Sequence, residues 1–150
     1  MAGWTNKGKA QVLGAALRAV ALPTNYYVAL VTSAVSPTAD TNLMSDLTEI
    51  AAGNGYTSGG YSLTPGATDF DSLLENDAND RGEIQIKDVV WNASGGSIPS
   101  SGTARWAVLT DDDGTVADRE IYYFWDLVTD RQASDGNPFT LQDLEIRTTE

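Results

Sequence analysis

The sequence predicts a mainly β protein: a single-domain β-sandwich or β-barrel, jelly-roll-like or β-tulip-like, with one amphipathic helix at the N-terminus. The second half of the 150-residue chain consists of short apolar segments separated by clusters of Gly, Pro, Ser and Asp, which is typical of such folds. The first 22 residues have helical rather than alternating periodicity. Since 150 residues is the usual size of one domain, we expect a helix or anchor at residues 1–22 and one β domain at residues 25–150.

Residues 5–21 have the periodicity of an amphipathic helix. Their apolar residues recur at i, i+3, i+4 and i+7, at Leu13, Ala16, Leu17 and Val20. Thr5 or Asn6 can cap the first amides, and Pro23, which cannot donate a helical hydrogen bond, is expected to end the helix after Leu22. Two interpretations stay open: the helix covers one end of a β-barrel, or it is an anchor that docks on an acidic partner.

The segments that follow the helix predict one buried strand and two loops. Residues 25–32 are rich in aromatic and β-branched residues and are apolar on both alternating faces, which indicates an interior strand. Residues 33–40 form a loop that contains proline, and residues 42–50 have the spacing of one or two helical turns. The glycine-rich stretch 53–66 predicts an exposed loop that leads into a short strand at 61–64.

Four further strands are expected at residues 83–91, 103–110, 119–128 and 139–148. In the third of them both alternating faces are apolar, so we expect both faces to be covered. In the first and the last the alternation slips by one residue, which predicts bulges or bends near Asp88 and near Gln142. Three aspartates and a glycine at 111–114 predict a hairpin turn with Gly114 at positive φ.

The chain contains no histidine and no cysteine, which removes most routes to catalysis. It therefore has no side chain that ordinarily titrates near neutrality and no easily ionised nucleophile. A carboxylate pair that includes Glu120 or Asp126 is the remaining option, but acids near hairpins commonly serve solubility alone. The motifs of nucleotide-binding loops and serine hydrolases do not occur. We expect a protein that is not an enzyme and carries no cofactor.

The densest cluster of acids, residues 69–80, does not continue into a calcium-binding loop. If Gly82 takes the sixth position of an EF-hand loop, Asp77 and Asn79 take the first and third, but Arg81 falls on the fifth. A guanidinium cannot ligate a cation. A looser calcium site here or at Asp111 to Asp113 is the alternative, because calcium tolerates irregular oxygen cages, but we expect solvated loop acids and no bound metal.

Acids outnumber bases by 21 to 9, which gives a formal net charge of −12. This charge repels a phosphate backbone, so nucleic acid is not an expected partner, and no apolar run is long enough for a membrane helix. The N-terminal segment is the exception, because it holds Lys7, Lys9 and Arg18 and no acid before Asp40. We expect these bases to bind a partner, together with Trp4 inserted into a pocket of a neighbour.

The other tryptophans, Trp91, Trp106 and Trp125, lie within expected strands. At such positions, packing in the core or in a subunit interface is expected rather than stacking on a sugar.

Several segments along most of the chain resemble small virion structural proteins of tailed bacteriophages, of the head decoration (cement) or tail-fibre-like kind. These segments are WTNKGK at 4–9, PTNYYVALVT at 23–32, GY at 60–61, WNASGGSIP at 91–99 and ARWAVLTD at 104–111. They specify strands and turns rather than chemistry, so no functional residue is carried over.

The resemblance implies a β-rich module that is present in many copies on a virion and is made in the host cytoplasm. A cement protein forms trimers on the capsid exterior, binds the major capsid protein and bridges adjacent capsomers. The alternatives are a tail or tail-fibre component and, third, a carbohydrate-binding module.

Overall fold

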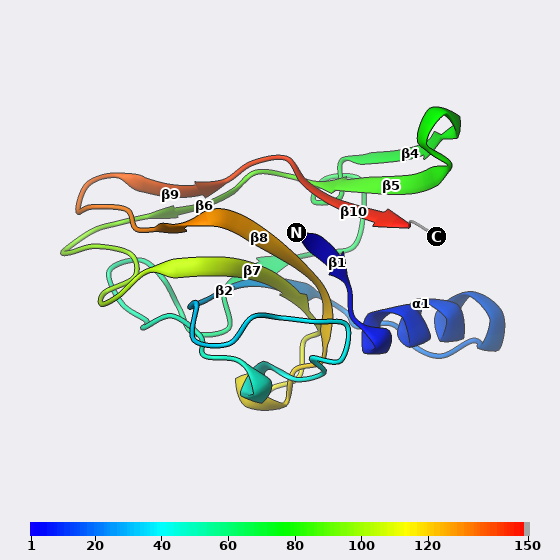
Figure 1. Cartoon of the computed structure of the whole chain (residues 1–150), viewed down its shortest axis with the longest axis horizontal. Coiled ribbons are helices and arrows are strands. Elements are labelled where there is room, and N and C mark those ends of the chain that lie inside the picture. The colour runs from blue at the N-terminus through cyan, green and yellow to red at the C-terminus, as the bar shows by residue number, and fades with distance from the viewer. Residues whose placement is uncertain (149–150) are drawn as a thin grey trace.

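The computed structural model describes residues 1–148 and has the expected mainly β fold with an N-terminal α-helix (Figure 1). The helix is α1 (Asn6–Arg18), and three short 3₁₀ turns are η1 (Met44–Asp46), η2 (Asp77–Asn79) and η3 (Val116–Asp118). The strands are β1 (Ala2–Trp4), β2 (Tyr26–Val31), β3 (Tyr61–Leu63), β4 (Ser72–Asn76), β5 (Arg81–Ile86), β6 (Val89–Asn92), β7 (Ala104–Thr110), β8 (Ile121–Arg131), β9 (Pro138–Leu141) and β10 (Leu144–Thr148).

The strands form two layers. One layer is a five-stranded antiparallel sheet in the order β1-β8-β7-β2-β3, and the other contains a three-stranded sheet, β10-β5-β4, and a two-stranded sheet, β6-β9 (Figure 1). The main core lies between the layers and joins Leu30 and Trp125 of the first to Trp91 and Ile146 of the second. The architecture is therefore that of a β-sandwich.

Both faces of the five-stranded sheet are covered, as the two-sided apolar pattern predicts. The first five residues of β8 are all buried. The face turned away from the main core packs Trp106 and Phe124 against Met44 and Leu47, which come from η1 and the residue after it. The cover therefore comes from this chain itself, and these strands need no neighbouring subunit to be buried.

The expected bends near Asp88 and Gln142 are confirmed, and they lie opposite each other. β5 ends at Ile86 and β6 starts at Val89. On the facing strands, β9 ends at Leu141 and β10 begins at Leu144, just after Asp143, which has a φ of 54°. The pairing of β5 with β10 therefore gives way to the pairing of β6 with β9 across the same break. A single pair of long strands is bent into two short sheets, as expected for a slip in the alternation.

The expected hairpin is present, since β7 pairs antiparallel with β8, but the expected turn at 111–114 with Gly114 at positive φ is wrong. β7 and β8 are joined by a longer connection that includes η3, and Gly114 is not among the glycines at positive φ. The carboxylates accept backbone N–H groups instead: Asp111 Oδ1 accepts from Glu120 at 3.1 Å, and Asp112 Oδ2 accepts from Thr24 at 3.0 Å and Asn25 at 3.1 Å. Such side-chain acceptors can order a loop without a two-residue turn.

Other boundaries also differ from the expectation. The helix ends at Ala19, in the left-handed conformation, and not at Pro23. The segment 42–50 does contain one helical turn, η1, within the one or two turns expected there. Strands β1 and β4 were not expected, and because β1 pairs with β8, the N-terminal residues belong to the sheet rather than to a separate anchor.

Candidate protein-docking surface

Helix α1 is attached to the sandwich at its first turn. The buried Thr5 side chain accepts the Gly8 N–H at 2.9 Å, as expected for its capping position, and donates to the Ile121 carbonyl. The Thr5 N–H in turn donates to the Tyr122 carbonyl at 3.0 Å. Gly8 is buried against the Tyr122 backbone, where a Cβ atom would lie 2.3 Å from the carbonyl oxygen. The start of the helix is therefore held against β8 by a cap and a close backbone contact.

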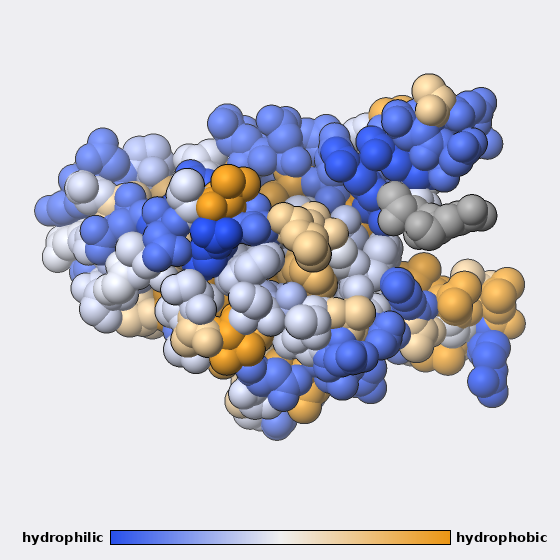
Figure 2. Space-filling view, viewed as in Figure 1, coloured by the Kyte–Doolittle hydropathy of each residue, from blue (hydrophilic) through white to orange (hydrophobic). Residues whose placement is uncertain are grey.

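Beyond this first turn, α1 projects past the end of the sheets (Figure 1). Its apolar side chains are not covered: Leu13 is 60% exposed and Leu17 is 78% exposed. Val20 and Leu22 follow the helix and are also exposed, and Figure 2 shows apolar side chains gathered at this end of the molecule. The interpretation that the helix covers one end of a barrel is therefore wrong.

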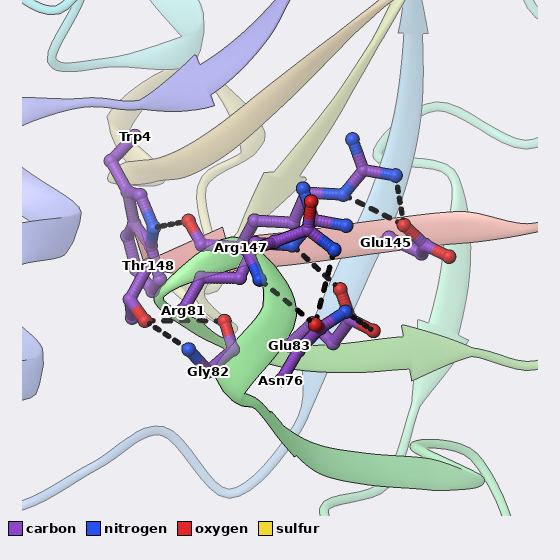
Figure 3. A network of polar contacts seen from close by, with 9 residues as sticks. Trp4, Asn76, Arg81, Gly82, Glu83, Glu145, Arg147 and Thr148 are labelled. Carbon is purple, nitrogen blue, oxygen red and sulfur yellow. Dashed lines mark hydrogen bonds and ion pairs between the residues drawn. The ribbon is translucent and has the colours of Figure 1, made fainter. Parts of the chain in front are cut away.

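The structure places the four expected partner-binding residues in different settings. Trp4 packs edge-on against Tyr123, with ring centroids 5.4 Å apart, and its Nε1 donates to the Arg147 carbonyl at 2.7 Å (Figure 3). Trp4 is thus committed to its own chain and is not a side chain extended for insertion. Lys7 lies 2.6 Å from Glu120, whereas Lys9 and Arg18 form no ion pair with residues 1–148.

A groove of about 570 Å³ lies between this N-terminal segment and the three-stranded sheet. Val12 of α1 contributes to one wall, and the rest of the lining is mostly apolar, with Trp4, Tyr26, Phe70, Leu73, Ile84 and Ile146. The volume is within the range of about 300–1,000 Å³ that is typical of ligand sites. Few polar groups converge on the groove, so its chemistry suits an apolar occupant.

The outer wall of the groove is the hairpin of β4, η2 and β5, here called the acidic arm (residues 71–83). It carries five carboxylates, at Asp71, Glu75, Asp77, Asp80 and Glu83, against one base, Arg81. Glu83 accepts from Asn76 at 3.2 Å and from Arg81 at 2.8 Å, and these hydrogen bonds, that of Asn76 first, hold the pKa of its carboxyl below the usual range (Figure 3). Glu83 lines the groove and is paired with Arg81, so the negative charge of this wall comes from the other four acids of the arm.

The arm is tied to the rest of the sandwich through β10. The Gly82 N–H donates to Thr148 Oγ1 at 2.9 Å, and the same hydroxyl donates back to the Gly82 carbonyl at 3.1 Å (Figure 3). One residue earlier, the Arg147 carbonyl accepts from Trp4 and the Arg147 side chain pairs with Glu145. The two walls of the groove, β1 and the arm, are therefore connected through the end of β10.

The floor near Phe70 is held by an ion pair between Asp69 and Lys87. Lys87 Nζ lies 2.5 Å from Asp69 Oδ1, and Asp69 Oδ2 accepts the Thr64 N–H at 2.8 Å. The Lys87 hydrogen bond, followed by that of Thr64, lowers the pKa of Asp69, and the pKa of Lys87 is raised by the same pairing. The loop that brings Phe70 to the groove is therefore fixed by charge as well as by packing.

We expect Asp69→Asn to lower the free energy of unfolding by about 1–2 kcal/mol near neutral pH. Because the folded pKa of Asp69 is depressed, the pair stabilises the protein above the unfolded value of about 3.9 and loses its effect as the pH falls through the folded pKa. At alkaline pH the stabilisation by the pair is lost when Lys87 deprotonates, as the pH rises above about 10.4 and through the raised pKa of Lys87 in the folded protein. Denaturant titrations from pH 3 to pH 8 should therefore show the deficit of the variant shrinking at low pH.

Asp71→Asn is the matched control, because Asp71 is exposed and its side chain makes no hydrogen bond to residues 1–148. An equal loss in both variants, or a deficit of Asp69→Asn that does not change with pH, would contradict this role of the ion pair.

Both acids that the sequence offers for a carboxylate pair lie beside bases in the structure. Glu120 pairs with Lys7, and Asp126 pairs with Arg105 at 2.9 Å and with the N-terminal amine at 3.3 Å, so each acid faces a base. Nowhere in the described chain do three or more acids gather so that they could hold a metal ion. The described α-helix is also too short to cross a membrane.

The tryptophans of the strands are buried, as expected: Trp91 is 5%, Trp106 8% and Trp125 6% exposed. None of the three offers an open ring face to a sugar.

A scan against protein-family models finds no match to this chain, and a search of curated proteins finds no significant relative.

The site described by the structure is an apolar groove with an acidic rim, beside a positively charged helix whose apolar side chains are uncovered. The sequence pattern indicates the helix and its bases. The groove has one sequence signal, the pair Leu73 and Leu74 within the acidic stretch, because two adjacent leucines among solvated acids are unusual for a loop.

Proposed function

We propose that this protein is a bacteriophage capsid decoration protein that binds the outer capsid surface and stabilises the shell by bridging capsomers. The observation that carries the proposal is α1, an amphipathic helix with uncovered apolar side chains that projects from an otherwise well-packed β-sandwich. Exposed apolar patches of this kind mark sites of protein contact. The resemblance of the sequence to small virion proteins supplies the kind of assembly.

The remainder of the molecule suits a role in which contact area is the function. The body is rigidly packed and strongly acidic, which keeps many copies soluble before they assemble. Its partners in this role are the major capsid protein and further copies of itself, as a trimer. The carbohydrate-binding alternative loses its stacking platform because the strand tryptophans are buried.

Copy number separates the decoration role from the tail role. Purified protein, added to shells that lack it, should bind to saturation at hundreds of copies per shell and raise the temperature at which the shells fall apart. Quantitative mass spectrometry of sedimented particles measures the copies. Binding at a dozen copies or fewer would favour a tail component, and absence of binding would contradict both virion roles.

Deletion of the first nine residues is not a clean test of the helix. It removes β1, the Thr5 cap and the packing of Trp4, so a loss of binding could reflect a damaged fold. Leu17→Asp is sharper, because the Leu17 side chain is exposed and its loss leaves the fold intact. We expect it to reduce shell loading at least tenfold, whereas Val128→Asp, at an equally exposed apolar position on β8, should leave loading unchanged.

A further inference from the structure

We infer that the partner of α1 is a second copy of this chain, whose apolar groove receives the exposed Leu13 and Leu17 side chains beneath the acidic arm. This inference rests on the proposed role of α1 as a docking element and names what it docks on. The groove and the helix are matched in polarity, in charge and in their lack of cover within one copy.

The apolar match is direct. The most exposed large apolar side chains of the helix, Leu13 and Leu17, are separated by one helical turn and so lie on one face. The groove presents Phe70, Ile84 and Ile146, with Leu73 at 77% exposure. Each surface leaves apolar area in water in an isolated copy, and packing one into the other removes both from water at once.

Charge identifies the occupant. Two copies that each carry a net charge of −12 repel one another, so a contact between them is favourable only where a positive segment of one meets a negative surface of the other. The chain before Asp40 holds three bases and no acid, the largest excess of positive charge in the sequence, and Lys9 and Arg18 on α1 have no ion-pair partner among residues 1–148. The acidic arm beside the groove carries the opposite charge, so helix and groove are complementary.

The contact joins two different surfaces of the same chain. α1 and the arm lie at the same end of the molecule (Figure 1). In a dimer, the helix of each copy can dock in the groove of the other. In a closed ring such as a trimer, the helix of each copy can dock in the groove of the next copy. Both arrangements place the same residues together, and in both the helix of one copy lies against the arm of another.

Cysteine cross-linking tests this contact directly, because the chain has no cysteine of its own. Leu17→Cys and Leu73→Cys are prepared as separate variants, mixed in the absence of shells and mildly oxidised. We expect a disulfide-linked dimer that contains one chain of each variant, seen by intact mass under denaturing conditions. Val128→Cys mixed with Leu73→Cys is the matched control, since Val128 is as exposed as Leu73, and this mixture should stay unlinked.

Three results would overturn the inference. The first is no dimer in the mixture of Leu17→Cys and Leu73→Cys. The second is efficient linkage of Leu17→Cys to itself, which indicates that helices pair with helices. The third is efficient linkage of Leu73→Cys to itself, which indicates that β4 edges pair instead.

Sedimentation of the wild-type protein and of Leu17→Asp gives an independent measure. The variant should need at least a tenfold higher concentration to associate, with an unchanged circular dichroism spectrum. Equal association of the two proteins, or a wild-type protein that stays monomeric at its highest soluble concentration, contradicts the inference.

These experiments use no capsid, so their outcome is separate from the test of the proposed function. Shell loading without the cross-link leaves the decoration role in place and assigns α1 to the capsid protein. The cross-link without shell loading leaves the contact between copies and removes the decoration role.

Discussion

Trp91→Ala should lower the free energy of unfolding by about 3–5 kcal/mol, the largest loss expected from one side chain of this protein. Trp91 lies on β6 in the second layer and is 5% exposed. Its ring packs against Tyr56 at 5.6 Å, Tyr61 at 6.1 Å and Phe139 at 6.1 Å between ring centroids. Truncation removes all three aromatic contacts and leaves a cavity at the junction of the two layers.

Denaturant titration monitored by circular dichroism measures the loss, with Val90→Ala as the control. Val90 neighbours Trp91 on the same strand but is 38% exposed, and its truncation should cost less than about 1 kcal/mol. Similar losses in the two variants would show that Trp91 does not join the layers in the way described.

Gly8→Ala should destabilise the protein by about 2 kcal/mol, although alanine is the better helix former by about 1 kcal/mol. The added Cβ would lie 2.3 Å from the Tyr122 carbonyl oxygen and 2.7 Å from Tyr122 Cα, and neither backbone atom can turn aside. The first turn must then move away from β8, which also weakens the hydrogen bond between Gly8 N–H and Thr5 Oγ1.

Gly14→Ala is the matched substitution within the same helix. Its Cβ would meet Val20 Cγ2 at 3.1 Å, and Val20 is an exposed side chain that can shift. We expect no loss, or a gain of up to about 1 kcal/mol from helix propensity. A thermal unfolding series on the two variants decides the matter: equal effects would mean that α1 is not held against β8 at Gly8.

Much of the sandwich could be predicted because its signals are local. The alternation in the strands, and its slip at Asp88 and Gln142, depend only on neighbouring residues and place both bends correctly. The Thr5 cap is likewise a local feature. The expected turn at 111–114 misleads because aspartate side chains can accept distant backbone amides, here those of Thr24 and Asn25, and no local pattern reports that.

The docking surface could be predicted only in part. An amphipathic pattern indicates that a helix has an apolar face, but it does not say whether the same chain covers it, and Leu13 and Leu17 remain exposed. The groove depends on β1, β5 and β10 meeting at one end of the sandwich, through contacts such as that of Trp4 with Arg147, 143 positions apart. The sequence predicts that Trp4 inserts into a neighbouring molecule, because no local pattern shows that Arg147 of the same chain accepts its N–H.

Hydrogen exchange of the α1 amides, compared between the free monomer and the assembled protein, tests most directly whether this protein works through its projecting helix. We predict that exchange in residues 9–18 slows at least tenfold on assembly, with a smaller slowing in the acidic arm and no change in β7 and the first five residues of β8, which are already largely buried. Unchanged exchange in α1, with new protection on another face of the sandwich, would contradict the account.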